Sequence, residues 1–583
     1  MNRNDWKIGM VESVERGVIS FFVDAKDISD KIQNGEILKI NGIDDFVYAK
    51  MTVDSFLLLR ITKVKSGVSD NFNNPNNLIS MNRLIFFAEP MGLLENGTFI
   101  SGASILPMVG KNIYGVTDKI LNMFFSSVGD DLVRLGNLNN YPSVSPSLNL
   151  YKLLTPHIAI VGNSGSGKST TLRTLLDRLN SVEDRLSEQF NMVVFDVHGD
   201  YSHLQFAKHI NVTDMHLPLE KLTVDDWSSA LLPSELTQRP ILNRAISIAK
   251  IHGDDKKILY AILCRMALTD TTKESFALIK KTALKWYTKI FEHEKNFDRW
   301  KLNFGNEEGS SEIKNQVNKF IYENGINSID DLLKRNEHAT FNISDLENAF
   351  ELVFSEEEVQ GNNKARINAE TMIARFRNLK NKYSNDGGIF NENNGTELLL
   401  DSMVMSENNK FFVINLTGLD DDLLKLVSNY LVREMFEVNY NSNFEDRKSL
   451  PFIYLYLDEA HRYVQSRDDG NTTIFERISR EGRKFNVYLG VISQIPSELS
   501  SVVMSQTGAY FIHRIQNSID LEYIRKNVPA ASNDLVKRLP VLPSGIALLS
   551  GTAFDVPFEL KVDDGEYKDI SSSLSPLVNK NGG

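Results

Sequence analysis

The spacing of apolar and polar positions divides this chain of 583 residues into regions with different patterns. Up to about residue 150, short apolar or alternating runs at residues 18–23, 36–40, 56–61 and 84–87 are separated by turns rich in Gly, Asn and Asp. Short runs of this kind, bounded by turn-forming residues, are typical of β-strands. The pattern therefore predicts a small amino-terminal β-barrel over residues 1–150, with a scaffold role.

The pattern changes near residue 151, where buried-type apolar runs begin to alternate with helical spacing. This alternation predicts an α/β core over residues 151–221 and 391–565. Between residues 222 and 390, apolar residues recur at steps of three and four, which predicts a helical insertion within that core. Residues 566–583 carry little apolar content, and we expect them to form a carboxy-terminal tail or a brace onto a neighbour.

A glycine-rich turn joins the first apolar run of the core, residues 158–161, to a helical segment. The turn matches the phosphate-loop pattern G-x-x-x-x-G-K-[ST] in full. Its glycines let backbone N–H groups converge on an anion, and the following helix presents its positive end to the same place. A chance Gly/Ser-rich loop is disfavoured because both the strand and the helix are present. We therefore expect a nucleoside triphosphate to be bound by Gly162, Asn163, Ser164, Gly165, Ser166, Gly167, Lys168, Ser169 and Thr170.

Two adjacent carboxylates close the apolar run at residues 452–457. Asp458 is expected to hold Mg²⁺ through water, and Glu459 to polarise the water that attacks the γ-phosphorus. In the phosphate loop, the Ser169 hydroxyl is expected to complete the Mg²⁺ shell, and Lys168 to hold the β- and γ-phosphates. The alternative is that the acidic pair only caps the next helix, but the phosphate loop earlier in the chain favours catalysis.

Polar residues also follow two other predicted strands. Asp196, His198 and Asp200 end the strand that begins near residue 192, and Gln494 ends the run at 487–493. Because ligands lie at the carboxyl ends of strands in α/β sheets, these side chains can reach the phosphates or their water, with Gln494 as a sensor of the γ-phosphate. An ordinary strand-to-loop junction and an ordinary strand-end glutamine are the alternatives. No three-ligand spacing marks His198 as a zinc ligand.

Three arginines, Arg477, Arg480 and Arg483, are spaced three apart on one face of a predicted helix. Their guanidinium groups can pair with surface carboxylates, or they can be presented across a subunit boundary to the phosphates of the next molecule. Spacing alone leaves both interpretations open.

The composition, 42% hydrophobic and 24% charged, is that of an ordinary globular protein. A net charge of −12 argues against a surface that coats nucleic acid non-specifically, although it leaves room for a local basic track. A solvated helix face is favoured over a DNA contact for one basic run in the insertion, formed by Arg375, Arg377, Lys380 and Lys382.

No window reaches the roughly 18 to 20 apolar residues that a membrane span needs, and the first residues do not resemble a signal peptide. We therefore expect a cytoplasmic protein with no membrane contact. The single cysteine, Cys264, lies in an apolar helical pattern and is expected to be a buried thiol, so that no intrachain disulfide forms.

Five sequence blocks, in this order, resemble the HerA branch of the HerA/FtsK motor ATPases. They are residues 162–170, 196–201, 457–462, 480–485 and 493–497. The resemblance implies a homohexamer of RecA-like P-loop ATPase cores, each with an amino-terminal HAS barrel and a helical insertion. ATP and Mg²⁺ would bind between subunits, and double-stranded DNA would pass through the central pore.

Carried over motif by motif, the resemblance implies a role for each site residue. Lys168 and Ser169 become the phosphate and Mg²⁺ ligands, Asp458 and Glu459 the Mg²⁺ ligand and the general base, and Gln494 the sensor. An arginine finger is expected from the neighbour's residues 480–483, with Arg483 favoured over Arg480.

Two positions depart from the family pattern. Residue 200 is Asp where the family usually has Glu, which shortens the reach of that carboxylate. Apart from Arg134, no arginine precedes Lys168 within about thirty residues, so no additional trans-acting arginine is assigned there.

Similar proteins act with a separately encoded effector, which is a NurA-type nuclease in DNA end processing, or a nuclease or sirtuin-type NAD-hydrolysing enzyme in defence against phage. This chain shows no nuclease constellation, so we expect the effector to be another protein, docked on the barrel side. Two functions follow: an ATP-driven motor that translocates or unwinds duplex DNA, or a nucleotide-gated ring that mainly assembles and activates effector subunits. A membrane-associated conjugation or partition motor is disfavoured by the missing span.

Overall fold

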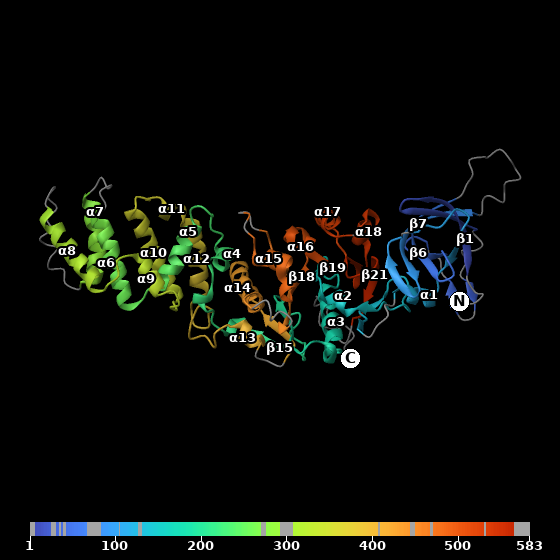
Figure 1. Cartoon of the computed structure of the whole chain (residues 1–583), viewed down its shortest axis with the longest axis horizontal. Helices are drawn as coiled ribbons and strands as arrows, with labels where there is room; N and C mark the ends of the chain where they lie inside the picture. The colour runs from blue at the N-terminus through green and yellow to red at the C-terminus, as the bar shows by residue number, and fades with distance from the viewer. Residues whose placement is uncertain are drawn as a thin grey trace, which may run out of the picture.

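Three parts of the chain follow one another along the long axis of the molecule: a β-barrel, a central sheet with helices, and a helical insertion (Figure 1). The structure is a computed structural model. It describes residues 6–24, 31–33, 36–38, 42–66, 83–103, 105–125, 131–269, 276–291, 307–405, 409–442, 449–466, 470, 472–529 and 532–564. The predicted tail at 566–583 lies outside these residues.

The amino-terminal strands form a barrel because the first strand pairs with the second, and the second also pairs with β7, which closes the ring β2-β1-β9-β5-β6-β7. The six strands are β1 (Lys7–Glu15), β2 (Val18–Asp24), β5 (Phe46–Lys50), β6 (Ser55–Ser66), β7 (Arg83–Glu95) and β9 (Asn112–Gly115). A seventh strand, β8 (Thr98–Ser101), pairs antiparallel with β7.

Strands β5 and β6 are buried on both faces. Val47 and Leu57 point into the barrel core, while the alternate residues Tyr48 and Leu58 belong to a second core that includes the central sheet. Because successive side chains of a strand point to opposite faces, these two strands fill the barrel and attach it to the rest of the chain at the same time.

The central sheet has ten strands in the order β11-β21-β20-β19-β13-β18-β17-β14-β16-β15. Seven neighbouring strands from β15 to β19 are parallel, whereas β20, β21 and β11 are antiparallel to their neighbours. The parallel strands are β13 (His157–Val161), β14 (Phe190–Asp196), β15 (Lys208–Asn211), β16 (Phe411–Asn415), β17 (Phe452–Leu457), β18 (Val487–Ser493) and β19 (Thr507–Ile512), and the antiparallel strands are β11 (Gly136–Leu138), β20 (Ile546–Ser550) and β21 (Phe558–Val562).

The predicted α/β core with an amino-terminal barrel and a helical insertion is confirmed. The predicted boundary at residue 150, however, falls after the chain has entered the core sheet, because the short strand β11 already pairs with β21. A three-residue strand that contains Gly and Asn shows no periodic pattern, so no local signal marks it. The exact domain limits remain proposals.

The insertion consists of helices packed around one apolar core. They are α4 (Val224–Leu231), α5 (Arg239–Ala249), α6 (Gly253–Thr269), α7 (Phe276–Ile290), α8 (Glu307–Glu323), α9 (Ile329–Arg335), α10 (Ile343–Val359), α11 (Ala365–Asn368) and α12 (Glu370–Tyr383). Cys264 on α6 is buried, as expected, and burial raises the pKa of its thiol to about 12.

The basic run on α12 is held by partners within the chain. Arg377 and Lys380 pair with the same carboxylate, Glu347, at 3.5 and 2.5 Å. Lys382 pairs with Asp420 at 2.7 Å, and Arg375 donates to the Leu231 carbonyl. These contacts favour a structural helix face over a DNA contact. Among the described residues, no helix has the length and apolar character needed to cross a membrane.

A buried ion pair joins the insertion to the core. Arg433, on α14 (Asp421–Tyr440), contacts Asp226 on α4 at 2.9 Å, and both side chains are largely buried. Removing one partner of such a pair leaves a charge without compensation. We therefore predict that Arg433→Met lowers the free energy of unfolding by about 3 kcal/mol, measured by urea denaturation followed by circular dichroism.

The matched control is Arg525→Met, which removes an exposed arginine that pairs with Glu522. Its denaturation midpoint should equal that of the natural chain, because exposed ion pairs contribute little. Equal midpoints for all three proteins would show that the Arg433 pair does not hold the insertion.

Candidate active site

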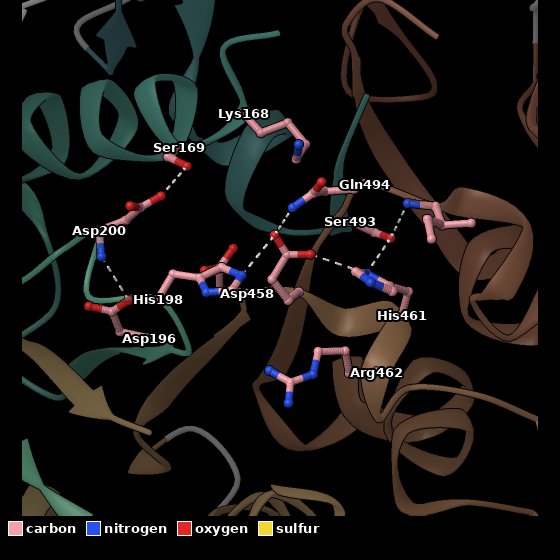
Figure 2. Close-up of polar contacts among 12 residues, drawn as sticks. Lys168, Ser169, Asp196, His198, Asp200, Asp458, His461, Arg462, Ser493 and Gln494 are labelled. Atoms are coloured by element: carbon pink, nitrogen blue, oxygen red, sulfur yellow. Dashed lines mark hydrogen bonds and ion pairs between the residues drawn. The ribbon is translucent and has the colours of Figure 1, made fainter. Parts of the chain in front are cut away.

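Four neighbouring strands of the central sheet, β13, β18, β17 and β14, bring the predicted site residues to one edge. The phosphate loop follows β13, Gln494 follows β18, Asp458 and Glu459 follow β17, and the loop with His198 and Asp200 follows β14. Since these strands are parallel, all four carboxyl ends lie at the same edge. Figure 2 shows the side chains from these ends pointing toward one another.

The phosphate loop depends on glycine at two close contacts. Gly162 and Gly167 have positive φ angles of 153° and 116°. A Cβ at Gly162 would lie 2.6 Å from the Cβ of His513, and one at Gly167 would lie 3.1 Å from the Cα of Gly545. Only glycine therefore permits this curvature and this packing.

The helix after the loop is α3 (Lys168–Asn180), and no side chain caps its first turn. Its free N–H groups and its positive end therefore face the concave side of the loop. Lys168 is 7% exposed, and its Nζ donates to the Asn163 carbonyl at 3.1 Å. Burial lowers the pKa of Lys168, while Glu459, Asp458 and Asp200 oppose that shift.

The end of β14 and the loop after it carry two carboxylates with different roles, Asp196 and Asp200. Asp196 accepts hydrogen bonds from the backbone N–H groups of Gly199, Asp200 and Tyr201, at 2.7, 3.1 and 3.1 Å. Asp196 thus shapes the loop and does not face the phosphates, so the prediction that it reaches them is not supported.

Asp200, presented by this loop, accepts the hydroxyl hydrogen of Ser169 at 2.7 Å. The side chain of Asp is therefore long enough to reach the phosphate loop. Because the hydrogen of Ser169 points to Asp200, the oxygen lone pairs stay free for a cation.

The second acidic pair is buried at the end of β17. Asp458 and Glu459 are 3% and 4% exposed. Burial raises the pKa of Asp458 well above its usual value, and the neighbouring Glu459, Asp196 and Asp200 add to this shift. Among the described residues, Asp458 Oδ2 has no hydrogen-bond donor. A buried carboxylate oxygen without a donor, at the same edge of the sheet as the Ser169 hydroxyl, suits a divalent cation such as Mg²⁺.

Glu459 is surrounded by three nitrogen-bearing side chains. The Gln494 amide donates to its Oε1, His198 Nε2 lies 3.6 Å from the same oxygen, and His461 Nδ1 lies 3.2 Å from Oε2 (Figure 2). The residue has a left-handed backbone, with φ 47° and ψ 40°. Non-glycine residues are rarely left-handed and concentrate at functional sites, so the fold holds Glu459 in a specific orientation.

The arginines predicted to reach a phosphate lie away from this edge. Arg480 lies in the last turn of α15 (Ile474–Glu481), and Arg483 lies in the next turn, η9 (Gly482–Phe485). The carbonyl of Ser479 contacts His157, the first residue of β13. The phosphate loop begins five residues after His157, which in a strand is about 16 Å. Neither arginine approaches the phosphate loop of its own chain.

The three arginines of this helix differ in their partners. Arg477 lies over the Tyr440 ring at 4.3 Å and pairs with Glu481 at 3.7 Å, as the first interpretation predicted. Arg480 and Arg483 are exposed, and no ion pair joins either to another described residue.

Two histidines near the site were given no role by sequence reasoning. His513 is fully buried behind the phosphate loop, where its Nδ1 contacts the Ile546 carbonyl at 3.0 Å and its Nε2 contacts Thr171 at 2.8 Å. Burial lowers the pKa of His513 to about 4, so it is a neutral brace. His461 belongs to the block at 457–462, but no local pattern indicated its contact with Glu459.

Comparison with known proteins identifies related sequences. The family model described as helicase HerA, central domain, matches residues 133–435, which is more than half of the chain. A probable helicase of Methanocaldococcus jannaschii is 24% identical over 569 residues, covering 93% of this chain and 92% of the relative. The DNA double-strand break repair helicase HerA of Saccharolobus solfataricus is 25% identical over 471 residues, covering 80% and 75%.

Among solved structures, VirB4 of Thermoanaerobacter pseudethanolicus aligns with a TM-score of 0.41 and 13% identity. The alignment covers 76% of this chain and 99% of that one.

The packing of Gly162 against His513 gives a test of the loop. Gly162→Ala should weaken binding of a fluorescent ATP analogue more than about tenfold, because relieving the 2.6 Å contact displaces the loop. The control Gly17→Ala also replaces a glycine of positive φ, but nothing lies within 4 Å of its added Cβ. That variant should bind the analogue as the natural chain does. Equal affinities for both variants would contradict the packing argument.

Proposed function

We propose, because the chain belongs to the HerA helicase family, that it is a hexameric ATP-hydrolysing motor that translocates or unwinds double-stranded DNA together with a separate effector protein. The observation that carries the proposal is the meeting of the phosphate loop, the acidic pair and Gln494 at the ends of adjacent parallel strands. That arrangement combines a site for a triphosphate with a carboxylate placed to activate water.

The phosphates would be held by the residues of the loop. These residues would present backbone N–H groups, the Lys168 ammonium and the Ser169 hydroxyl to the ligand. They are Gly162, Asn163, Ser164, Gly165, Ser166, Gly167, Lys168, Ser169 and Thr170. Ser169 and Asp458 would hold Mg²⁺, which supplies positive charge to the β- and γ-phosphate oxygens when bound. Asp200 keeps the Ser169 hydroxyl turned so that its lone pairs face that ion.

Glu459 would take the proton of the attacking water. Its Oε2 has no well-aligned hydrogen-bond donor among the described residues and is therefore free to accept one. Gln494 would turn its amide toward the γ-phosphate and the water, and His198, which is half exposed beside Glu459, would face the same phosphate.

Two positively charged residues would act on the neighbouring subunit. Arg480 and Arg483 are exposed and lie at the opposite end of β13 from the phosphate loop. In a ring of identical subunits, such residues can complete the site of the next copy, where an arginine stabilises charge in the transition state. This placement supports a homohexamer with ATP at each boundary.

The DNA and effector parts of the proposal rest on the relatives and on the barrel. Curated relatives of this chain are DNA double-strand break repair helicases. The barrel lies at the end of the molecule away from the insertion (Figure 1), and it exposes apolar residues such as Val53 and Met108, which are 89% and 81% exposed. Exposed apolar residues suit docking of an effector, either a NurA-like or other nuclease or a sirtuin-type NAD-hydrolysing enzyme, in DNA end processing or anti-phage defence.

The alternative function is a nucleotide-gated ring that mainly assembles and activates effector subunits. The Gln494 contact to Glu459 is the observation that favours it, because it occupies one carboxylate oxygen of the proposed base. Slow turnover would then serve as a switch.

Steady-state ATPase with and without duplex DNA tests the proposed motor. We expect duplex DNA to stimulate the natural chain, and Lys168→Ala and Glu459→Gln to lose more than about 100-fold of that activity, because phosphate positioning and water activation are removed. The exposed variant Lys334→Ala on the insertion is the control and should match the natural chain. Absence of phosphate release by the natural chain would refute the motor and the switch alike.

The same measurement separates the two functions. A motor requires DNA-stimulated turnover and displacement of a block bound to the duplex. An assembly platform predicts that duplex DNA stimulates the ATPase little. It also predicts that the Glu459→Gln variant still forms rings with the effector.

Mixed rings test whether the arginines act across subunits. Arg483→Ala should lose most of its ATPase although its own phosphate loop is intact, and the Arg480→Ala variant shows which residue is the finger. Mixing Arg483→Ala with Lys168→Ala subunits should restore part of the activity, because some boundaries then combine an intact arginine with an intact loop. Activity that stays absent in every mixture, with rings confirmed by mass, would argue against action in trans.

A further inference from the structure

Glu459 has a polar neighbour at each carboxylate oxygen, from different segments: a hydrogen bond on Oε1 and a close imidazole nitrogen beside Oε2. Oε1 accepts the Gln494 amide from the end of β18, and Oε2 lies 3.2 Å from His461 Nδ1 in the turn η8 (Ala460–Arg462) after β17. His198 Nε2, at 3.6 Å from Oε1, is more distant and half exposed. Among these three side chains, His461 therefore makes the contact to Oε2.

His461 is itself fixed by the strand that carries Gln494. Its Nδ1 also lies 3.4 Å from the Ser493 hydroxyl, which accepts the Ile495 N–H at 3.1 Å. The carbonyl of Ser493 accepts the N–H of Gly162, the first residue of the phosphate loop. Figure 2 shows the contact between His461 and Ser493.

The surroundings select one tautomer of the imidazole. A lone pair on Nδ1 would face the Glu459 carboxylate, which is unfavourable, whereas an N–H there is attracted to it. The Ser493 oxygen can accept the same hydrogen, since its other contact comes from the Ile495 N–H. His461 thus carries its hydrogen on Nδ1, which contacts Ser493 and lies 3.2 Å from Glu459 Oε2. Burial, which lowers the pKa of His461, favours the neutral ring.

Gln494 donates an amide N–H to Oε1 in this structure. If the side chain turns toward the γ-phosphate to act as a sensor, Glu459 loses this hydrogen bond. A base placed about 1 Å away from its water loses much of its catalytic effect.

We propose that His461 is the positioning residue that keeps Glu459 directed at the attacking water, through Nδ1–H to Oε2, while Gln494 is released to the nucleotide. This inference rests on the proposed ATPase function and adds a role for a residue between the acidic pair and β18. His461 does not touch the nucleotide in this scheme, so its loss affects the chemical step and leaves nucleotide binding intact.

Two substitutions of similar size test the geometry. The amide nitrogen of Asn is as far from the backbone as Nδ1, whereas that of Gln corresponds to Nε2. His461→Ala and His461→Gln should lower kcat about 100-fold with KM and the Kd of a fluorescent ATP analogue unchanged. His461→Asn should recover most of kcat. The exposed His338→Ala on the insertion is the control and should match the natural chain.

The outcomes separate this inference from the proposed function. If the natural chain hydrolyses ATP, Glu459→Gln does not, and His461→Ala keeps full activity, the role of His461 is refuted and the ATPase stands. Equal loss in Asn and Gln variants, or a loss of affinity together with kcat, would indicate a merely structural histidine. If the natural chain releases no phosphate, the proposed function fails and the inference fails with it.

Discussion

The central constraint on this structure is the burial of several carboxylates beside one ammonium at a single edge of the sheet. Asp196, Asp458 and Glu459 are almost fully buried, and Lys168 is the buried cation that faces Asp458, Glu459 and Asp200. Burial disfavours the charged form of Asp458, and the neighbouring carboxylates add to this effect, so its pKa is raised. Asp196 is stabilised by three backbone N–H groups, but Oδ2 of Asp458 has no hydrogen-bond donor among the described residues. The edge is thus arranged for additional positive charge, and the phosphate loop beside it for negative charge.

The phosphate loop keeps its shape through contacts from distant parts of the chain. His513 packs on Gly162 and contacts Thr171, while Ser544 donates to the Gly165 carbonyl at 2.7 Å. The backbone N–H of Gly545 donates to the Ser166 carbonyl. These contacts occupy the outer side of the loop, so its inner N–H groups remain available. Preorganised donors of this kind need no rearrangement when an anion binds.

The sequence predicted the parts of the site whose chemistry is local. The phosphate loop and the adjacent pair Asp458 and Glu459 are contiguous motifs, and the alternating and helical patterns predicted the barrel, core and insertion. It could not predict contacts between distant positions, such as Thr171 with His513, or Glu459 with His461 and Gln494. These depend on the strand order β14-β17-β18-β13, which no local period encodes. Asp196 is a different case, because its partners are backbone groups of its own loop, and a carboxylate at a strand end can face either a ligand or its own loop.

The barrel is tied to the strands that brace the phosphate loop. Arg538, in α18 (Asn533–Arg538), pairs with Asp44 of the barrel and with Glu559 of β21. Strand β21 pairs with β20, which begins one residue after Gly545, and Gly545 contacts the loop. Because β5 and β6 also share a core with the central sheet, the barrel cannot rotate without disturbing buried apolar contacts. If residues 543–546 rearrange during nucleotide turnover, the barrel must therefore move together with β20 and β21, or the contacts between the barrel and these strands must break.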